Sequence, residues 1–310
     1  VPIDLTQLVG RGWLSDADLA AIAPPADPAT LDIDAVTHAK VAALRTAFDR
    51  AELDDEDEFA AYCEAQAFWL DDYALFDAIK GAHDHADWRT WPEALVRRDE
   101  EALEQARRDN ADGIEFAKFC QWVVEQQWHE LRAYAAEHGV RIIGDVPIFV
   151  AMDSVDVWAN RDLFKVDREG EAEVVAGVPP DYFSPTGQKW GNPIYRWDVM
   201  AERDWIWWKE RVRRSMALVD IVRIDHFRGL VAYWAVPAGS TTARNFTMGQ
   251  TLYNYDFLGR STSTGFGVTS WLPRGAPAPR RGGPPASGPG TLPPPPDPRR
   301  RPPRHAGVDQ

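Results

Sequence analysis

The feature that most constrains the fold of this chain is a helical segment followed directly by a strand, which occurs twice. Residues 112–139 carry apolar side chains at three- and four-residue steps, and a β-branched run follows at 141–150. Residues 205–217 are also helical in pattern and lead into an apolar run at 218–224, which predicts a buried strand. Alternating helices and strands are typical of an α/β fold with parallel strands. We therefore expect helix–strand repeats of the kind that build β/α barrels.

Each of the two predicted strands has an aspartate near its C-terminal end, Asp145 in the first and Asp225 in the second. Active sites of β/α barrels are built at that end of the strands. Side chains alternate between the faces of a strand, so Arg223 points to the same side as Asp225. A neighbouring cation favours the ionised carboxylate, which is the state that attacks an electrophilic carbon. A structural ion pair is the alternative, and it is the commoner outcome for an isolated Arg-x-Asp match.

A long stretch between the two repeats, residues 177–193, shows neither helical nor strand periodicity. It holds four prolines and three glycines. Structureless stretches of this length inside a compact domain are usually functional or disordered. The residues that argue against disorder are aromatics and amides: Tyr182, Phe183, Gln188, Trp190 and Asn192. We interpret the stretch as a binding loop suited to gripping a sugar.

The charge and the composition limit which classes of binding partner are expected. The net charge is −14, and the eight arginines and three aspartates after residue 245 make that end basic, so the body before it is strongly acidic. An acidic body argues against nucleic acid or an anionic membrane as a partner. All of the fourteen tryptophans except Trp271 precede residue 245, and their faces suit sugar rings, although most tryptophans are packing residues. With no apolar run of 18 residues, a soluble, cytoplasmic protein is expected.

The first part of the chain is expected to be helical and architectural. Residues 35–50 and 58–80 have helical apolar spacing, the second with a thick aromatic face. Cys63 is isolated within the second of these patterns and Cys120 within that of residues 112–139, which predicts reduced, buried thiols. The sequence GAHDH at 81–85 suggests a metal site, but without further ligands a solvated loop is the better interpretation.

Several motifs in one order carry a family resemblance. They are residues 69–76 (WLDDYALF), 126–128 (QQW), 143–148 (IGDVPI), 153–158 (DSVDVW), 178–184 (VPPDYFS), 190–193 (WGNP) and 223–229 (RIDHFRG). The ordered set, over roughly residues 3–245, resembles the bacterial 4-α-glucanotransferases, also called amylomaltases or disproportionating enzymes.

The resemblance implies a (β/α)8 barrel of the α-amylase type and retaining transfer of α-1,4-glucan segments between maltooligosaccharides. Asp225 matches the family nucleophile, which would form a covalent glycosyl-enzyme, and Arg223 matches its supporting cation. Asp145 and His226 match positions in or beside the pocket for the transferred sugar. Tyr182, Phe183, Gln188 and Trp190 match a mobile loop over the glucan, and we add Asn192 to these substrate-binding candidates. No metal, organic cofactor or obligate protein partner is implied.

The chain departs from the family pattern in its carboxylates. Retaining chemistry uses two carboxyl groups roughly 5–5.5 Å apart. The family's acid/base glutamate follows the nucleophile, whereas the last glutamate here is Glu210. The family's later aspartate also has no match. We therefore expect residues 1–245 to form an incomplete barrel with a helical insertion at about 30–140, and the chain as written to be inactive.

The two ends also depart from the family. The family's first strand and a tyrosine-bearing loop would precede Val1, so truncation at both ends is expected. Residues 273–304 hold thirteen of the twenty-four prolines, which predicts a disordered tail over 246–310. A sequence read out of frame explains this composition better than a basic docking tail. An unclosed barrel leaves strand edges open, so we also expect poor solubility or a molten state.

Alternatives to an active transferase stay open. A non-catalytic glucan-binding protein would keep the aromatic loop without the acid/base, and a non-functional fragment would neither bind nor react. Within the enzyme class, a hydrolytic relative of α-amylase is a further alternative.

Overall fold

The computed structural model describes residues 2–22, 32–53 and 57–250. Residues 247–250 of the predicted disordered tail form a strand, which corrects the prediction there, and the tail from position 251 onward lies outside the described residues. The predicted domain boundary near residue 245 falls close to the end of the described part and stays a prediction.

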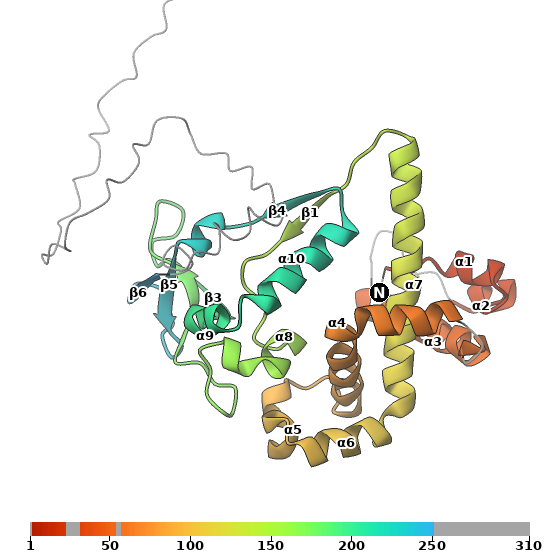
Figure 1. Cartoon of the computed structure of the whole chain (residues 1–310), viewed down its shortest axis with the longest axis horizontal. Helices are drawn as coiled ribbons and strands as arrows, with labels where there is room; N and C mark the ends of the chain where they lie inside the picture. Colours follow the sequence, from red (N-terminus) through yellow and green to blue (C-terminus); the bar gives the residue numbers. More distant parts are fainter. Residues whose placement is uncertain (1, 23–31, 54–56, 251–310) are drawn as a thin grey trace, which may run out of the picture. The chain divides into compact units, whose positions relative to one another are not determined.

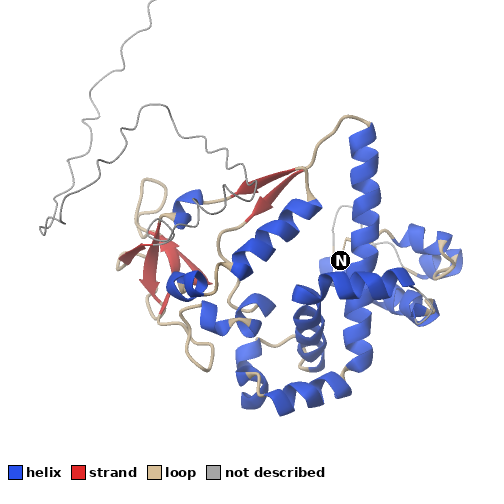
Figure 2. Cartoon of the chain, viewed as in Figure 1, coloured by secondary structure: helices blue, strands red, loops and turns tan. Residues whose placement is uncertain are grey.

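The described part combines a helical region with two small sheets (Figures 1 and 2). The helices are α1 (Leu5–Gly10), α2 (Asp16–Ala21), α3 (Ile33–Arg50), α4 (Asp57–Ala82), α5 (Glu93–Arg97), α6 (Glu100–Asp109), α7 (Ala111–Glu137), α8 (Val155–Ala159), α9 (Trp197–Glu202) and α10 (Ile206–Leu218). Short 3-10 helices are η2 (Trp88–Thr90), η3 (Arg161–Leu163) and η4 (Phe227–Leu230). The strands are β1 (Ile143–Val146), β2 (Val174–Val178), β3 (Gln188–Pro193), β4 (Ile221–Ile224), β5 (Ala232–Pro237) and β6 (Thr247–Gln250).

The helices predicted from apolar spacing are confirmed to within a few residues. α7 ends as its sequence predicts, because Gly139 takes a φ of +71°, the left-handed conformation that closes helices. The Val140 amide then donates to the Ala135 carbonyl at 2.9 Å. α3 begins at Asp32, whose carboxylate accepts from the Ala35 amide at 3.0 Å. α7 packs against both α3 and α4, and the helical insertion at about 30–140 stays a prediction.

The two helix–strand repeats meet in a parallel pair of strands, β1 and β4. The first strand is shorter than the predicted 141–150, because Pro147 has no amide hydrogen to continue the ladder. α10 extends through Leu218, which shortens the second strand from its N-terminal side.

The prediction that the second strand is buried is wrong. The side chains of Ile143 and Ile221 are 65% and 39% exposed. α10 packs on the pair, and within the described residues no third strand joins it, so Ile143 and Ile221 stay open to solvent while Val146 is buried.

The stretch 177–193 is not without strand structure, which corrects that part of the prediction. β2 and β3 form an antiparallel hairpin in a four-stranded sheet of order β3-β2-β5-β6. The strand signal is weak because glycines replace the usual β-branched residues. Gly177 is required by close packing: a β-carbon there would lie 2.5 Å from the Gln188 carbonyl oxygen. The irregular part of the stretch is therefore confined to the tip of the hairpin.

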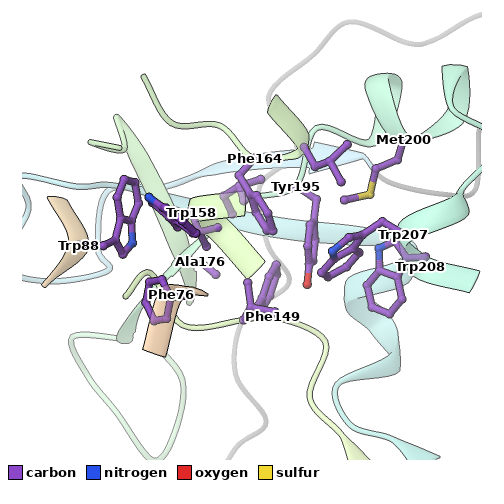
Figure 3. Close-up of a cluster of buried hydrophobic side chains, with 14 of the residues drawn as sticks. Phe76, Trp88, Phe149, Trp158, Phe164, Ala176, Tyr195, Met200, Trp207 and Trp208 are labelled. Atoms are coloured by element: carbon purple, nitrogen blue, oxygen red, sulfur yellow. The ribbon is translucent and has the colours of Figure 1, made fainter. Parts of the chain in front are cut away.

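Two large apolar clusters hold the described part together. One joins α1–α3 to α4 and α7, and the other joins α4–α6 and α8–α10 to the strands. Figure 3 shows the second, in which Phe149, Phe164, Tyr195 and Trp207 lie in one aromatic group with Trp158 beside it. Nine tryptophans are buried in these clusters, so the tryptophan content is mainly a packing feature, as expected.

The prediction of a reduced, buried thiol is confirmed for Cys120 and only partly for Cys63. Cys120 is buried, Cys63 is half-buried, and neither forms a disulfide. Burial raises the pKa of the Cys120 thiol to about 12. His83, Asp84 and His85 lie in a turn, and no group of three or more metal-ligating side chains occurs in residues 2–22, 32–53 and 57–250. No helix in these ranges is long and apolar enough to cross a membrane.

Candidate active site

The candidate site begins where β1 and β4 end side by side. The register places Asp145 opposite Arg223 and Val146 opposite Ile224. The Asp225 amide then donates to the Val146 carbonyl at 3.2 Å, so the aspartate follows directly on the last paired residue. Both predicted aspartates thus stand at the carboxyl end of the parallel pair, as the helix–strand repeats predict.

Arg223 joins the two aspartates into one cluster. Its Nη2 atom lies 2.6 Å from Asp225 Oδ1, and its Nη1 atom lies 3.4 Å from Asp145 Oδ2. The three side chains are 51–61% exposed, so the cluster opens to solvent. The guanidinium holds the Asp225 carboxylate by a charge-assisted hydrogen bond and limits its rotation. The predicted contact between Arg223 and Asp225 is confirmed.

His226 and Trp190 form a second part of the site. Their rings meet edge to face with centroids 5.1 Å apart. The Trp190 indole nitrogen donates to Gln188 Oε1 at 3.1 Å within β3, and the ring contact with His226 links the hairpin to the residue after Asp225. His226 has a φ of +47°, an uncommon conformation for a non-glycine residue, and this turns the chain sharply after β4. Sequence reasoning placed Gln188 and Trp190 in one loop and His226 after a separate strand, and the structure brings the rings of His226 and Trp190 into contact.

The hairpin tip carries two exposed aromatic rings. Tyr182 and Phe183 are 96% and 89% exposed, and their rings contact each other edge to face at 5.7 Å. Asp181 shapes the tip, because its Oδ1 atom accepts from the amides of Phe183 and Ser184 at 2.9 and 2.7 Å. Large exposed aromatics on a shaped turn are available to stack on a ligand.

The base of the hairpin is anchored more firmly than its tip. Asn192 donates from its side-chain amide to the Val150 carbonyl at 2.7 Å, so that part of Asn192 supports the hairpin. Lys189 donates to the carbonyls of Ala238 and Ser240 beyond β5. These bonds hold Trp190 in place beside His226, and the Ala243 amide, which donates to the Thr186 carbonyl at 3.0 Å, restrains the tip.

Sequence reasoning missed a support behind the site, which is centred on Asp220. One carboxylate oxygen of Asp220 accepts from the Ile142 amide at 2.8 Å, and the other pairs with Arg132 of α7 at 2.9 Å. Arg132 also donates to the Ala217 carbonyl, and Trp128 of α7 donates to the Leu218 carbonyl. Asp220 thus ties the beginnings of β1 and β4 to α7. An acid directly before a predicted strand was the available signal, but its partners are too distant in sequence to be inferred.

The pKa of Asp220 gives a first testable expectation. The bond from the Ile142 amide, and next the Arg132 guanidinium, lower its pKa from 3.8. A carboxyl with a lowered folded pKa stabilises the fold above its unfolded pKa and loses that contribution as pH falls through the folded value. We expect Asp220→Asn to lower the melting temperature at pH 7 and the difference from wild type to shrink between pH 5 and pH 2. A difference independent of pH would contradict this account, and Asp198→Asn, on the exposed side of α9, is the control.

Comparison with families of known proteins gives one model that matches most of the chain. The model is described as 4-alpha-glucanotransferase, and it matches residues 2–258. The match continues past Asn245, where the motif resemblance was expected to stop.

Curated relatives carry the same description. A 4-alpha-glucanotransferase of Thermus thermophilus is 46% identical over 245 residues, which cover 78% of this chain and 48% of the relative. One from Synechocystis is 44% identical over 248 residues, covering 78% of this chain and 49% of the relative. A rice relative described as chloroplastic/amyloplastic is 40% identical, covering 78% and 41%. The chain thus spans about half the length of the curated relatives it matches.

Solved structures with a similar fold include two amylomaltases. The amylomaltase of Streptococcus agalactiae, solved with acarbose, has a TM-score of 0.80 at 32% identity, covering 88% of this chain and 56% of that one. The Corynebacterium glutamicum amylomaltase has a TM-score of 0.54 at 22% identity, covering 70% and 28%, and supports the fold alone. The predicted fold class, an α/β fold with part of a (β/α)8 barrel and helical insertions, is confirmed by the first similarity.

Proposed function

Since the chain belongs to the 4-alpha-glucanotransferase family, we propose that its site serves the transfer of α-1,4-glucan segments between maltooligosaccharides, with Asp225 as the nucleophile of a retaining double displacement. The family predicted from the sequence motifs is confirmed.

The observation that carries the proposal is the position of Asp225. It follows the last paired residue of β4, and the Arg223 guanidinium holds its carboxylate at 2.6 Å. A nucleophile must be oriented toward the anomeric carbon, and a charge-assisted bond to a neighbouring strand residue supplies such orientation. Asp145, held by the same guanidinium, is proposed to bind hydroxyls of the sugar that is transferred.

The aromatic residues of the hairpin are proposed to hold the glucan chain. Tyr182 and Phe183 present exposed rings at the tip, and Trp190 stands at the base against His226. Sugar rings have apolar faces that stack on such side chains, while the amides of Gln188 and Asn192 are polar neighbours. We assign these contacts to successive glucose units.

The first chemical step follows from these positions. A carboxylate oxygen of Asp225 attacks the anomeric carbon, the glycosidic carbon–oxygen bond breaks, and its electron pair leaves with the oxygen of the departing glucan. That oxygen needs a proton, and the 4-hydroxyl of an acceptor must later lose one. A second carboxyl group performs both transfers in retaining enzymes. The last glutamate of this chain, Glu210, lies on α10 in an ion pair with Arg213.

We therefore expect the 310-residue chain to attack only donors whose leaving group needs no proton. The test is incubation with a 5-fluoro-α-glucosyl fluoride. Cleavage of its anomeric carbon–fluorine bond releases fluoride with the electron pair of that bond. Mass spectrometry of peptides is expected to find the sugar on Asp225, and maltotriose is expected to be left unchanged. Asp225→Asn should abolish labelling, and Glu210→Gln, a matched change on α10, should label like wild type. Labelling of another carboxylate, or none at saturating reagent, would contradict Asp225 as the nucleophile.

A second candidate, non-catalytic glucan binding, is favoured by one observation: the exposed aromatic tip is present, while no glutamate follows Glu210. Isothermal titration with maltooligosaccharides separates the candidates. Binding without any adduct from the fluoride supports this second function, and an adduct supports the first. Localisation in the cytoplasm stays a prediction.

A further inference from the structure

A cleft of about 300 Å³ lies between α4, α8 and α10, and none of its lining residues belongs to the Asp225 site. We call it the α4–α10 cleft, and the argument uses Phe68, Trp69, Asp156, Trp207, Glu210 and Arg211 of its lining. Trp69 belongs to the motif 69–76, for which the proposed function supplies no role.

Aromatic side chains form part of the cleft wall. Phe68 is 57% exposed although it is large and apolar, and Trp69 follows it on α4. Trp207 of α10 is 8% exposed and contributes to the opposite wall. An exposed phenylalanine at the mouth of a cleft provides an apolar surface that a ligand can cover.

The polar lining contains an acceptor that the protein leaves unsatisfied. Asp156 of α8 is half-buried, and desolvation raises the pKa of its carboxyl, an effect that Arg211 partly opposes. Among the described residues, no hydrogen bond or ion pair reaches this carboxylate. Asn160, also in the cleft, donates its amide to the Asp156 backbone carbonyl and keeps its own carbonyl oxygen available. A carboxylate that no protein group donates to can accept a hydrogen bond from a ligand hydroxyl.

The charged residues of the cleft come in both signs and are mostly engaged. Arg211 donates to the Pro147 carbonyl at 2.9 Å, and its guanidinium lies 5.3 Å from the Trp207 ring. Arg214, also in the lining, pairs with Glu125. Glu210 pairs with Arg213. Neither an anion nor a cation therefore meets a surplus of opposite charge, whereas a neutral ligand with several hydroxyls meets acceptors beside aromatic faces.

We propose that the α4–α10 cleft binds a glucose unit of a neutral saccharide, at a site separate from Asp225. A sugar hydroxyl donates to the Asp156 carboxylate, and the apolar face of the ring covers Phe68 and Trp69. The volume suits one pyranose ring or a small part of a chain, being at the lower end of ligand pockets, which span roughly 300–1,000 Å³. The site would hold a glucan at a second point away from the strand ends.

The test is titration of the full chain with maltose, in a Tyr182→Ala/Phe183→Ala background that removes the proposed hairpin contacts. We expect saturable binding by calorimetry with a change in tryptophan fluorescence. Phe68→Ala and Asp156→Ala are each expected to weaken binding about tenfold, which corresponds to about 1.4 kcal/mol. Tyr134→Ala is the matched control, because Tyr134 is a 62% exposed aromatic on α7, outside the cleft.

Each result decides the proposal. Unchanged maltose affinity in both cleft variants would overturn it, as would no binding at all in the hairpin background. Inorganic phosphate that binds and displaces maltose would also overturn it, because the arginines would then define the ligand. Phe68 is exposed, so its variant should melt like the parent, and this separates lost binding from lost folding. Labelling of Asp225 by the 5-fluoro-α-glucosyl fluoride tests the active site separately. Failure of the cleft proposal can therefore be told apart from failure of the proposed function.

Discussion

Replacing Glu125 by leucine is expected to lower the free energy of unfolding by about 3–5 kcal/mol, the usual effect of leaving one partner of a buried ion pair alone. Glu125 is 9% exposed on α7. Its carboxylate is held by both Nη atoms of Arg214 on α10, one of them at 2.8 Å. Without the carboxylate, the Arg214 guanidinium is left over the Trp69 ring with its charge uncompensated. Chemical denaturation followed by circular dichroism measures the change.

A double-mutant cycle supplies the control. Arg214→Met alone should also be strongly destabilising, because it leaves the buried Glu125 carboxylate with only the His129 imidazole, 3.7 Å away, as a partner. The double variant Glu125→Leu/Arg214→Met should recover most of the loss, since apolar replacements of buried ion pairs are often close to neutral. Additive losses would show that the two side chains act separately, which the bidentate geometry contradicts.

Replacing Trp158 by alanine is expected to lower the free energy of unfolding by about 3–5 kcal/mol, as large aromatic truncations in cores do. Trp158 is fully buried beside Phe76 and Trp91 (Figure 3 shows it near Phe76). Its indole nitrogen donates to the Leu95 carbonyl at 2.9 Å, and the Arg98 guanidinium lies 4.2 Å from its ring. The loss combines a cavity, an unpaired carbonyl and a lost cation–π contact.

Two comparison variants test whether burial of the ring explains the loss expected for Trp158→Ala. Trp158→Phe keeps most of the ring and loses the hydrogen bond, so it should cost clearly less than alanine. Trp190→Ala removes a tryptophan that is 38% exposed, and it should change stability little. Equal losses for Trp158→Ala and Trp190→Ala would mean that burial does not govern the contribution of these tryptophans.

The parts of the fold that follow from local pattern were predictable from the sequence. The long helix at 112–139 is α7, because its apolar spacing and its closing glycine agree. The Arg223–Asp225 contact follows from strand alternation alone. The strand burial was not predictable, because an apolar run reports the tendency of a segment to be buried and not whether other strands are present to cover it.

In the candidate site, too, features set by neighbouring residues were predictable, whereas contacts between distant segments were not. Asp145 and Asp225 were placed correctly at strand ends because both follow a β-branched run. The hairpin was missed because Gly177 and Gly191 give no strand signal, although close packing requires the first of them. Asp220 and Arg132 were missed because they lie on elements far apart in the chain, and nothing in either segment identifies the other.

The pairing of β1 with β4 has a consequence for the order in which the molecule folds. Ile142 and Asp220, which meet at the start of the pair, are 78 residues apart in sequence. Closing a loop of that length costs chain entropy before the contacts of the pair can stabilise it. Parallel pairs of this kind therefore form slowly. Helices such as α7 need only neighbouring residues and form early. Asp145, Arg223 and Asp225 therefore come together late, so a newly synthesised chain has its helical scaffold before Asp225, the proposed nucleophile, is in place.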